Sequence, residues 1–155
     1  METDLQGLKI YLELEQVRLN DKFTYDIRID DRIDKKKLQV PPLLLQPFIE
    51  NAILHGLMHK KGRGRLKVTF KNLQSENISI EVEDDGIGRQ KAAMYSSSKK
   101  KESMGLDISN KRLQALEIIF KKKASYTIVD LKNDQNSPIG TKVIILLPIL
   151  GGVHR

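Results

Sequence analysis

Cysteine is missing from this 155-residue chain, and aromatic residues make up only 5% of it. Without cysteine, neither a disulfide framework nor a cysteine-based zinc site can form, which fits a reducing compartment. No apolar run approaches the roughly 20 residues that cross a bilayer, and the acidic N-terminus lacks the apolar segment of a signal peptide. The length suits one domain, and a hydrophobic content of 39% is enough for a core.

Positive charge is the main bias of the composition, since 27 Lys and Arg against 20 Asp and Glu give a net charge of +7. The simplest interpretation is solubility. A basic segment that covers a polyphosphate is the second, and the run Lys99-Lys100-Lys101 is a candidate for it. Nucleic-acid binding ranks third, because the scarce aromatic residues form no stacking motif. We therefore expect no nucleic-acid partner.

Residues 46–56 (QPFIENAILHG) carry a polar stripe on an otherwise apolar helix. A period near 3.6 places Glu50, Asn51 and His55 on one side, opposite the apolar residues. An amide and an imidazole one turn apart, beside a carboxylate, suit a helix that lines a ligand site better than a solvated face. The amide oxygen of Asn51 suits Mg²⁺, which takes the rest of its shell from waters and phosphates. For Glu50 and His55 the alternatives are an exposed helical carboxylate and a packed histidine.

Residues 83–88 (EDDGIG) end a strand in which apolar and polar residues alternate. A carboxylate held at a strand end can accept a hydrogen bond from the exocyclic amine of a base, and Asp84 is the candidate. Gly86 and Gly88 would let the backbone approach a flat ring closely. The two stretches together predict a nucleotide pocket, with adenine at Asp84 and metal-bound phosphates at Asn51.

Both stretches resemble sequence boxes of the GHKL ATP-binding superfamily, which joins histidine kinases, DNA gyrase, chaperone ATPases and mismatch-repair ATPases. Glu50–Gly56 resembles the N box and Asp84–Gly88 the G1 box. Ser103–Leu106 resembles a G2 box, and Gly140–Pro148 resembles the closing strand. Four boxes in the family's order, within residues 5–149, look like the catalytic domain of a LytS/YehU-type sensor histidine kinase.

The resemblance implies an α+β fold, the Bergerat-type two-layer sandwich with helices packed on one face of a mixed β-sheet. Residues 1–19 resemble the tail of a preceding dimerisation and phosphoacceptor helix, and 20–150 the ATP-binding domain. Residues 89–104 are basic, rich in serine and without a period, and we interpret them as a mobile loop over the nucleotide. The pattern itself predicts helices at 4–19, from Pro41-Pro42 through the N box, and at 105–120, and strands near 23–30, 65–73, 77–84, 125–131 and 140–148.

The resemblance also implies the ligands, ATP and Mg²⁺, with Asn51 as the metal ligand. Glu50 would join the metal shell through water or orient the acceptor imidazole, and His55 would bond a phosphate or the ribose. Gly105 and Leu106 would open a helix whose free N–H groups hold phosphate. Thr141 would lie at the pocket floor; the alternative is an ordinary residue at a strand start.

One missing group bears on the reaction. In the hydrolytic branches of the superfamily, a Glu one turn before the metal-binding Asn activates water, and Pro47 holds that position here. The resemblance therefore implies γ-phosphoryl transfer from Mg-ATP to a histidine on a helical domain outside this chain, with a response regulator downstream. The parent would be a membrane-anchored homodimer, with this domain in the cytoplasm. Two alternatives stay open, a GHKL serine kinase of a regulator and a nucleotide-binding module without transfer.

Overall fold

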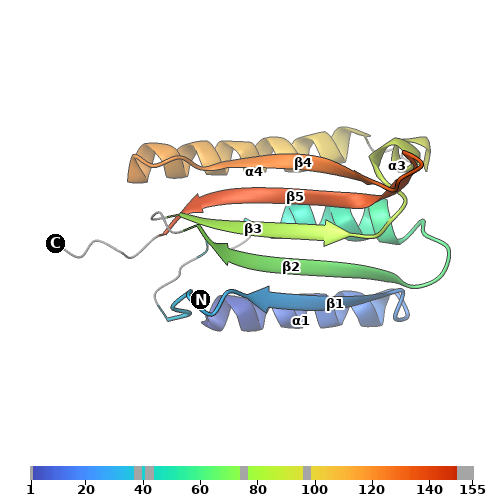
Figure 1. The fold of residues 1–155 in the computed structure, drawn as a ribbon, viewed down its shortest axis with the longest axis horizontal. Coiled ribbons are helices and arrows are strands. Elements are labelled where there is room, and N and C mark those ends of the chain that lie inside the picture. Colours follow the sequence, from blue (N-terminus) through green and yellow to red (C-terminus); the bar gives the residue numbers. More distant parts are fainter. Residues whose placement is uncertain (1, 37–39, 41–43, 74–76, 96–98, 150–155) are drawn as a thin grey trace.

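The computed structural model describes residues 2–36, 40, 44–73, 77–95 and 99–149, without the side chains of residues 2–4, 95, 99–106 and 120. Its five strands form one sheet, and the helices lie behind that sheet in Figure 1. The predicted α+β sandwich is therefore confirmed. Within the described residues, no helix combines the length and the hydrophobicity that a membrane span requires.

The sheet is mixed and has the strand order β1-β2-β3-β5-β4 (Figure 1). The edge strand β1 (Phe23–Ile29) runs parallel to β2 (Gly64–Asn72). The other neighbours are antiparallel: β3 (Asn77–Asp84) lies between β2 and β5 (Pro138–Pro148), and β4 (Ser125–Lys132) forms the far edge. The sequence predicted all five strands. Alternation of apolar and polar residues is clear in β1 and β3, whereas β5 contains the unbroken apolar run Val143–Leu147.

The covered face of the sheet carries the core and leads directly to Asp84. Side chains on alternate positions of β2 and β3 are almost fully buried: Leu66, Val68, Phe70, Ile78, Ile80 and Val82. Asp84 is the next residue in the row on β3, and only 4% of it is exposed. The period of two therefore carries a carboxyl group into the covered face at the end of the strand.

Helices of different length cover this face. They are α1 (Glu2–Arg18), α2 (Gln46–Asn51), the π-helix η1 (Ala52–Leu57), α3 (Arg89–Tyr95) and α4 (Lys99–Phe120). Four of these helices contribute anchors to one hydrophobic core, among them Leu12 of α1, Phe48 of α2, Ile53 of η1 and Leu113 of α4.

The helix of the N-box segment begins later than predicted. It starts at Gln46 rather than at Pro41-Pro42, and residues 41–43 lie outside the described residues. Pro47 sits in its first turn, where the missing N–H costs nothing because the helix has no carbonyl four residues earlier to accept it.

The prediction of a loop over residues 89–104 is wrong wherever the structure describes this segment. α3 covers 89–95, and α4 begins at Lys99; residues 96–98 lie outside the described residues. α3 is rich in good helix formers, Arg, Gln, Lys, Ala and Met. Of the described side chains of α3 only that of Ala92 is buried, so this helix has no apolar stripe that a helical period could reveal.

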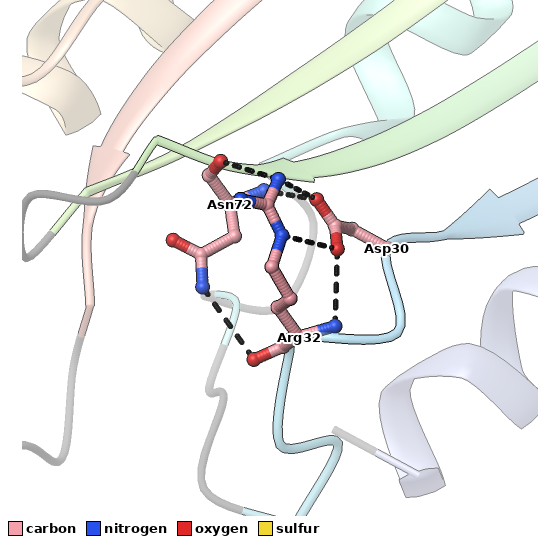
Figure 2. Close-up of polar contacts among 3 residues, drawn as sticks. All are labelled: Asp30, Arg32 and Asn72. Carbon is pink, nitrogen blue, oxygen red and sulfur yellow. Dashed lines mark hydrogen bonds and ion pairs between the residues drawn. The ribbon is translucent and has the colours of Figure 1, made fainter.

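The connection that follows β1 is tied to the end of β2 by Asp30, Arg32 and Asn72 (Figure 2). Arg32 donates through Nε and Nη2 to the Asp30 carboxylate at 3.0 and 2.6 Å, and the Asn72 N–H donates to it at 3.3 Å. These hydrogen bonds, led by those from Arg32, hold the pKa of Asp30 well below its usual range. The contacts fix the start of the connection that leads to α2.

Candidate functional site

A cavity of about 520 Å³ lies between the helices and the end of the sheet where β3 finishes and β5 begins. Five of the residues predicted from the sequence line it: Asn51, His55, Asp84, Gly88 and Thr141. The structure thus brings together residues from α2, η1, β3 and β5 that are far apart in the chain. The volume falls within the range of small-molecule sites.

The remaining walls of the cavity are largely apolar. They come from Phe48, Ala52, Val82, Tyr126, Ile128 and Val143. The Phe48 and Tyr126 rings meet edge to face, with centroids 5.1 Å apart. An apolar slot with a few polar groups at fixed points suits a flat, partly polar ligand.

Sequence reasoning missed two charged residues that also line the cavity, Arg89 and Asp107. Arg89 is the first residue of α3 and donates to Asp130 of β4 with Nε and Nη2, both at 2.8 Å. This pairing holds the pKa of Asp130 below its usual range. The only signal in the sequence was the position of Arg89, directly after Gly88.

The π-helical geometry of η1 changes which residues share a face. The N–H of Met58 bonds the carbonyl of Ile53 at 2.9 Å, five residues back, whereas an α-helix bonds four residues back. Asn51, His55 and Ala52 all line the cavity. π-Helical turns are uncommon and occur often at functional sites.

Glu50 does not share that face, so the predicted stripe of Glu50, Asn51 and His55 is wrong in this respect. The Glu50 carboxylate accepts a hydrogen bond from Gln46 Nε2 at 2.8 Å and another from the Tyr11 hydroxyl of α1. Burial, followed by the charges of Glu50 and Glu15, raises the pKa of Tyr11 well above its usual range. Glu50 thus joins α2 to α1, and its catalytic role stays a prediction.

Asp84 presents a buried carboxyl group to the cavity. Its Oδ1 accepts the Gly86 N–H at 2.9 Å, and the Thr141 N–H also donates to the group. Burial raises the pKa of Asp84 to about 7, more than these hydrogen bonds lower it, and the charges of Asp85 and Glu83 act in the same direction as burial. The Asp84 carboxyl therefore titrates near neutral pH.

The neighbouring Asp85 points elsewhere. Its Oδ1 accepts the Arg65 N–H at 2.7 Å, and its Oδ2 lies 2.9 Å from Lys60 Nζ. Two adjacent carboxylates at the end of β3 thus have different surroundings, because successive side chains of a strand point to opposite faces.

Gly86 and Gly88 are required by the protein itself, before any ligand is considered. A Cβ on Gly86 would lie 2.3 Å from the carbonyl carbon of Gly56, so only glycine lets these backbones meet. Gly88 has a φ of +83°, a backbone conformation that residues with a side chain rarely adopt. A Cβ there would also lie 2.8 Å from the Cβ of Pro138. The predicted approach of these two glycines to a flat ring stays a prediction.

Gly105 does not open a helix as predicted, because α4 begins six residues earlier, at Lys99. The Lys, Glu and Met residues before Gly105 are good helix formers, and they extend the helix through it. The side chains of residues 99–106, including Leu106, lie outside the described residues. A contact of Gly105 and Leu106 with phosphate therefore stays a prediction.

The sequence and the structure both have relatives among known proteins. A family model described as histidine kinase-, DNA gyrase B-, and HSP90-like ATPase (HATPase_c) matches residues 41–151. Sensor protein LytS of Oceanobacillus iheyensis and sensor histidine kinase YpdA of Escherichia coli are each 35% identical over 85 residues. The matched part is 55% of this chain but only 14% of each relative.

Among solved structures, the catalytic domain of histidine kinase ThkA has a TM-score of 0.61 at 13% identity, and the match covers 96% of this chain and 92% of that one. ThkA in complex with the response regulator protein TrrA has a TM-score of 0.55 at 14% identity, covering 99% and 42%. At such identities these structures support the fold alone. The match of the family model covers most of this chain, so the chain belongs to the histidine kinase-, DNA gyrase B-, and HSP90-like ATPase family.

Proposed function

We propose that this chain is the ATP-binding catalytic domain of a sensor histidine kinase, and that it transfers the γ-phosphoryl group of ATP to a histidine imidazole on another domain. The observation that carries the proposal is the buried Asp84 carboxyl, which lines one cavity with Asn51 of the adjoining helix. One group recognises a base, and the other lies where phosphates would be held.

Adenine would lie at Asp84, whose ionised carboxylate accepts a hydrogen bond from the exocyclic amine. The apolar walls that include Phe48, Val82 and Tyr126 would cover the ring. The triphosphate would extend toward Asn51 and His55, with Arg89 as a cation on the side of α3. The chain thereby supplies positioning and charge neutralisation, which phosphoryl transfer chiefly requires.

Asn51 also fits a role at Mg²⁺. Within the described residues, no group of three or more His, Asp or Glu side chains converges on one point, so a site made of protein carboxylates is not available there. Mg²⁺ needs few protein ligands when a nucleotide supplies phosphate oxygens, and one amide oxygen suffices. Bound there, the ion would neutralise charge on the phosphates.

The residues of α2 favour transfer of the phosphoryl group over hydrolysis of ATP. Pro47 has no basic group, and the Glu50 carboxylate is engaged by Gln46 and Tyr11. α2 therefore brings no carboxylate to the cavity that would activate water. In the proposed reaction an imidazole nitrogen attacks the γ-phosphorus, the bond to the β–γ bridging oxygen breaks, and ADP leaves.

The proposal extends to the parent protein and its partners. α1 would be the end of a preceding dimerisation and phosphoacceptor helix. It carries exposed Ile10, Leu14 and Val17, at 57, 63 and 75% exposure, spaced so that they share one face. Such a stripe suits a helix that packs against others in a longer protein. A membrane-anchored homodimer, this domain in the cytoplasm and a response regulator as phosphoryl acceptor complete the proposal.

The test is nucleotide titration followed by a transfer assay. By calorimetry the chain should bind ATP with Mg²⁺, yet with labelled ATP it should hydrolyse little and carry no phosphate. A longer form that includes the preceding helical segment should gain acid-labile, base-stable phosphate. Label on serine of a regulator would instead support a serine kinase, and binding without any transfer a nucleotide-binding module. Acid-labile, base-stable phosphate on residues 1–155 alone would contradict the mechanism.

We also expect α3 to be more mobile than the sheet without nucleotide. Little of α3 is buried, and Arg89, Ala92 and Ala93 line the cavity, so ATP should order it. By hydrogen exchange, amides of 89–95 should exchange faster than those of β3 in the free domain and slow by about fivefold or more with ATP. Residues 5–18 of α1 serve as the internal control and should not change. Exchange as slow as that of β3 without nucleotide would be the contrary result.

A further inference from the structure

Gly56 of η1 is the point where the helix of the site meets the buried carboxyl group at the end of β3. A Cβ built on Gly56 would lie 2.6 Å from Oδ1, 3.0 Å from Cγ and 3.3 Å from Oδ2 of Asp84. Real Cβ atoms almost never approach a heavy atom within 3.0 Å. Only hydrogen therefore fits between the helix and the carboxyl group.

Both sides of this contact are fixed. Backbone N–H groups of Gly86 and Thr141 donate to the Asp84 carboxyl. On the other side, the Gly56 carbonyl accepts the Ile87 N–H at 3.3 Å, and the backbone of Gly86 lies against Gly56. The carboxyl group that a methyl group on Gly56 would meet is held by these bonds, so it cannot simply swing aside. Either the carboxyl rotates away from its two donors, or η1 moves off the sheet.

We propose that Gly56 is a positioning residue for base recognition: its missing side chain sets the depth and direction of the Asp84 carboxyl group, and with it the preference for a purine that carries a 6-amino group. This inference rests on the proposed function, in which Asp84 accepts a hydrogen bond from adenine. Asp84, which recognises the base, lies on β3, and Gly56, which orients Asp84, lies on η1, which continues directly from Asn51 of α2.

A stability cycle tests the contact without any nucleotide. Gly56→Ala should lower the melting temperature by about 5 °C or more, because the added methyl group forces either the Asp84 carboxyl off its two donors or η1 off the sheet. In an Asp84→Ala background the atoms nearest to the new methyl are gone, so the same change should cost only about 1–2 °C. Equal losses in both backgrounds would show that the carboxyl is not what requires glycine.

A matched control is available in α1. Gly7 is also helical, but a Cβ on Gly7 meets no heavy atom within 4 Å. Gly7→Ala should therefore leave stability equal or higher, because alanine favours the helix more than glycine does. If Gly56→Ala alone proves too unstable to study, the Gly56→Ala/Asp84→Ala domain should still fold, and failure of that double variant to fold would overturn the inference.

Discrimination between nucleotides tests the recognition role, which a purely structural glycine would not alter. Inosine triphosphate has a 6-oxo group in place of the amine, so the wild type should bind ATP at least about tenfold more tightly. Gly56→Ala should lose most of that preference, chiefly by weaker ATP binding, while Gly7→Ala keeps it. A wild type that binds both nucleotides equally would refute the proposed role of Asp84 and this inference with it. A Gly56→Ala domain with the full wild-type preference would refute this inference alone.

Discussion

Asp84→Asn is expected to lower the affinity for ATP about ten- to a hundredfold while the domain stays folded, because a charge-assisted hydrogen bond is replaced by an amide that can turn its own donor toward the adenine amine. Asp84 is nearly fully buried and lines the cavity, so the loss has no compensation from solvent. Calorimetric titration with ATP and Mg²⁺ measures it directly.

The adjacent residue supplies the control for this experiment. Asp85→Asn removes the same charge one residue away, but Asp85 accepts from the Arg65 N–H and pairs with Lys60 instead of facing the cavity. Its affinity for ATP should stay within about twofold of the wild type, the range expected for a screened surface charge. Wild-type affinity in Asp84→Asn, or an equal loss in Asp85→Asn, would remove Asp84 from base recognition.

The second expected result is that pH moves stability and ATP binding in opposite directions. The pKa of Asp84 is raised to about 7 in the folded domain, against about 3.9 in an unfolded chain. A raised carboxyl pKa stabilises the fold fully below the unfolded value and loses that contribution as pH rises through the folded value. From pH 5 to pH 8 the Asp84 contribution should fall by roughly 2.5 kcal/mol.

ATP needs the ionised carboxylate, so its affinity should rise about tenfold from pH 6 to pH 8. Other titratable or charged groups near Asp84 contribute as well: Glu83 and Asp85 on its own strand, and His55, Arg89 and Asp107 around the cavity. The nucleotide phosphates also titrate. Subtracting the pH profile of Asp84→Asn removes these shared contributions. Parallel profiles for the wild type and Asp84→Asn, in denaturant unfolding and in ATP titration, would contradict the assignment.

The sheet and the ends of its strands were accessible from the sequence because each strand has one covered face. The same alternation that buries Ile80 and Val82 also places Asp84 inward, so the pattern located a site residue as well as a strand. The helical face was less accessible. The polar stripe grouped Glu50 with His55, although residues five apart are separated by about 140° around an α-helix, and Glu50 instead bonds Gln46 and Tyr11 of α1. The residues of α3 favour a helix but form no buried stripe. Hydrophobic periodicity alone therefore does not predict this helix.

The parallel pairing of β1 with β2 determines where a self-sufficient fragment can begin. The family match starts at residue 41, whereas β1 ends at Ile29 and pairs along its whole length with Gly64–Phe70. α2 and η1 belong to the crossover between these two strands, so the helix that carries Asn51 is anchored at both ends by one strand pair. A fragment that begins at residue 41 would lack the edge strand β1. The backbone N–H and C=O groups of β2 would then be unpaired on that side, and such an exposed strand edge promotes aggregation. Trimming for expression or crystallisation should therefore stop before Phe23, even though the recognisable motifs all lie downstream.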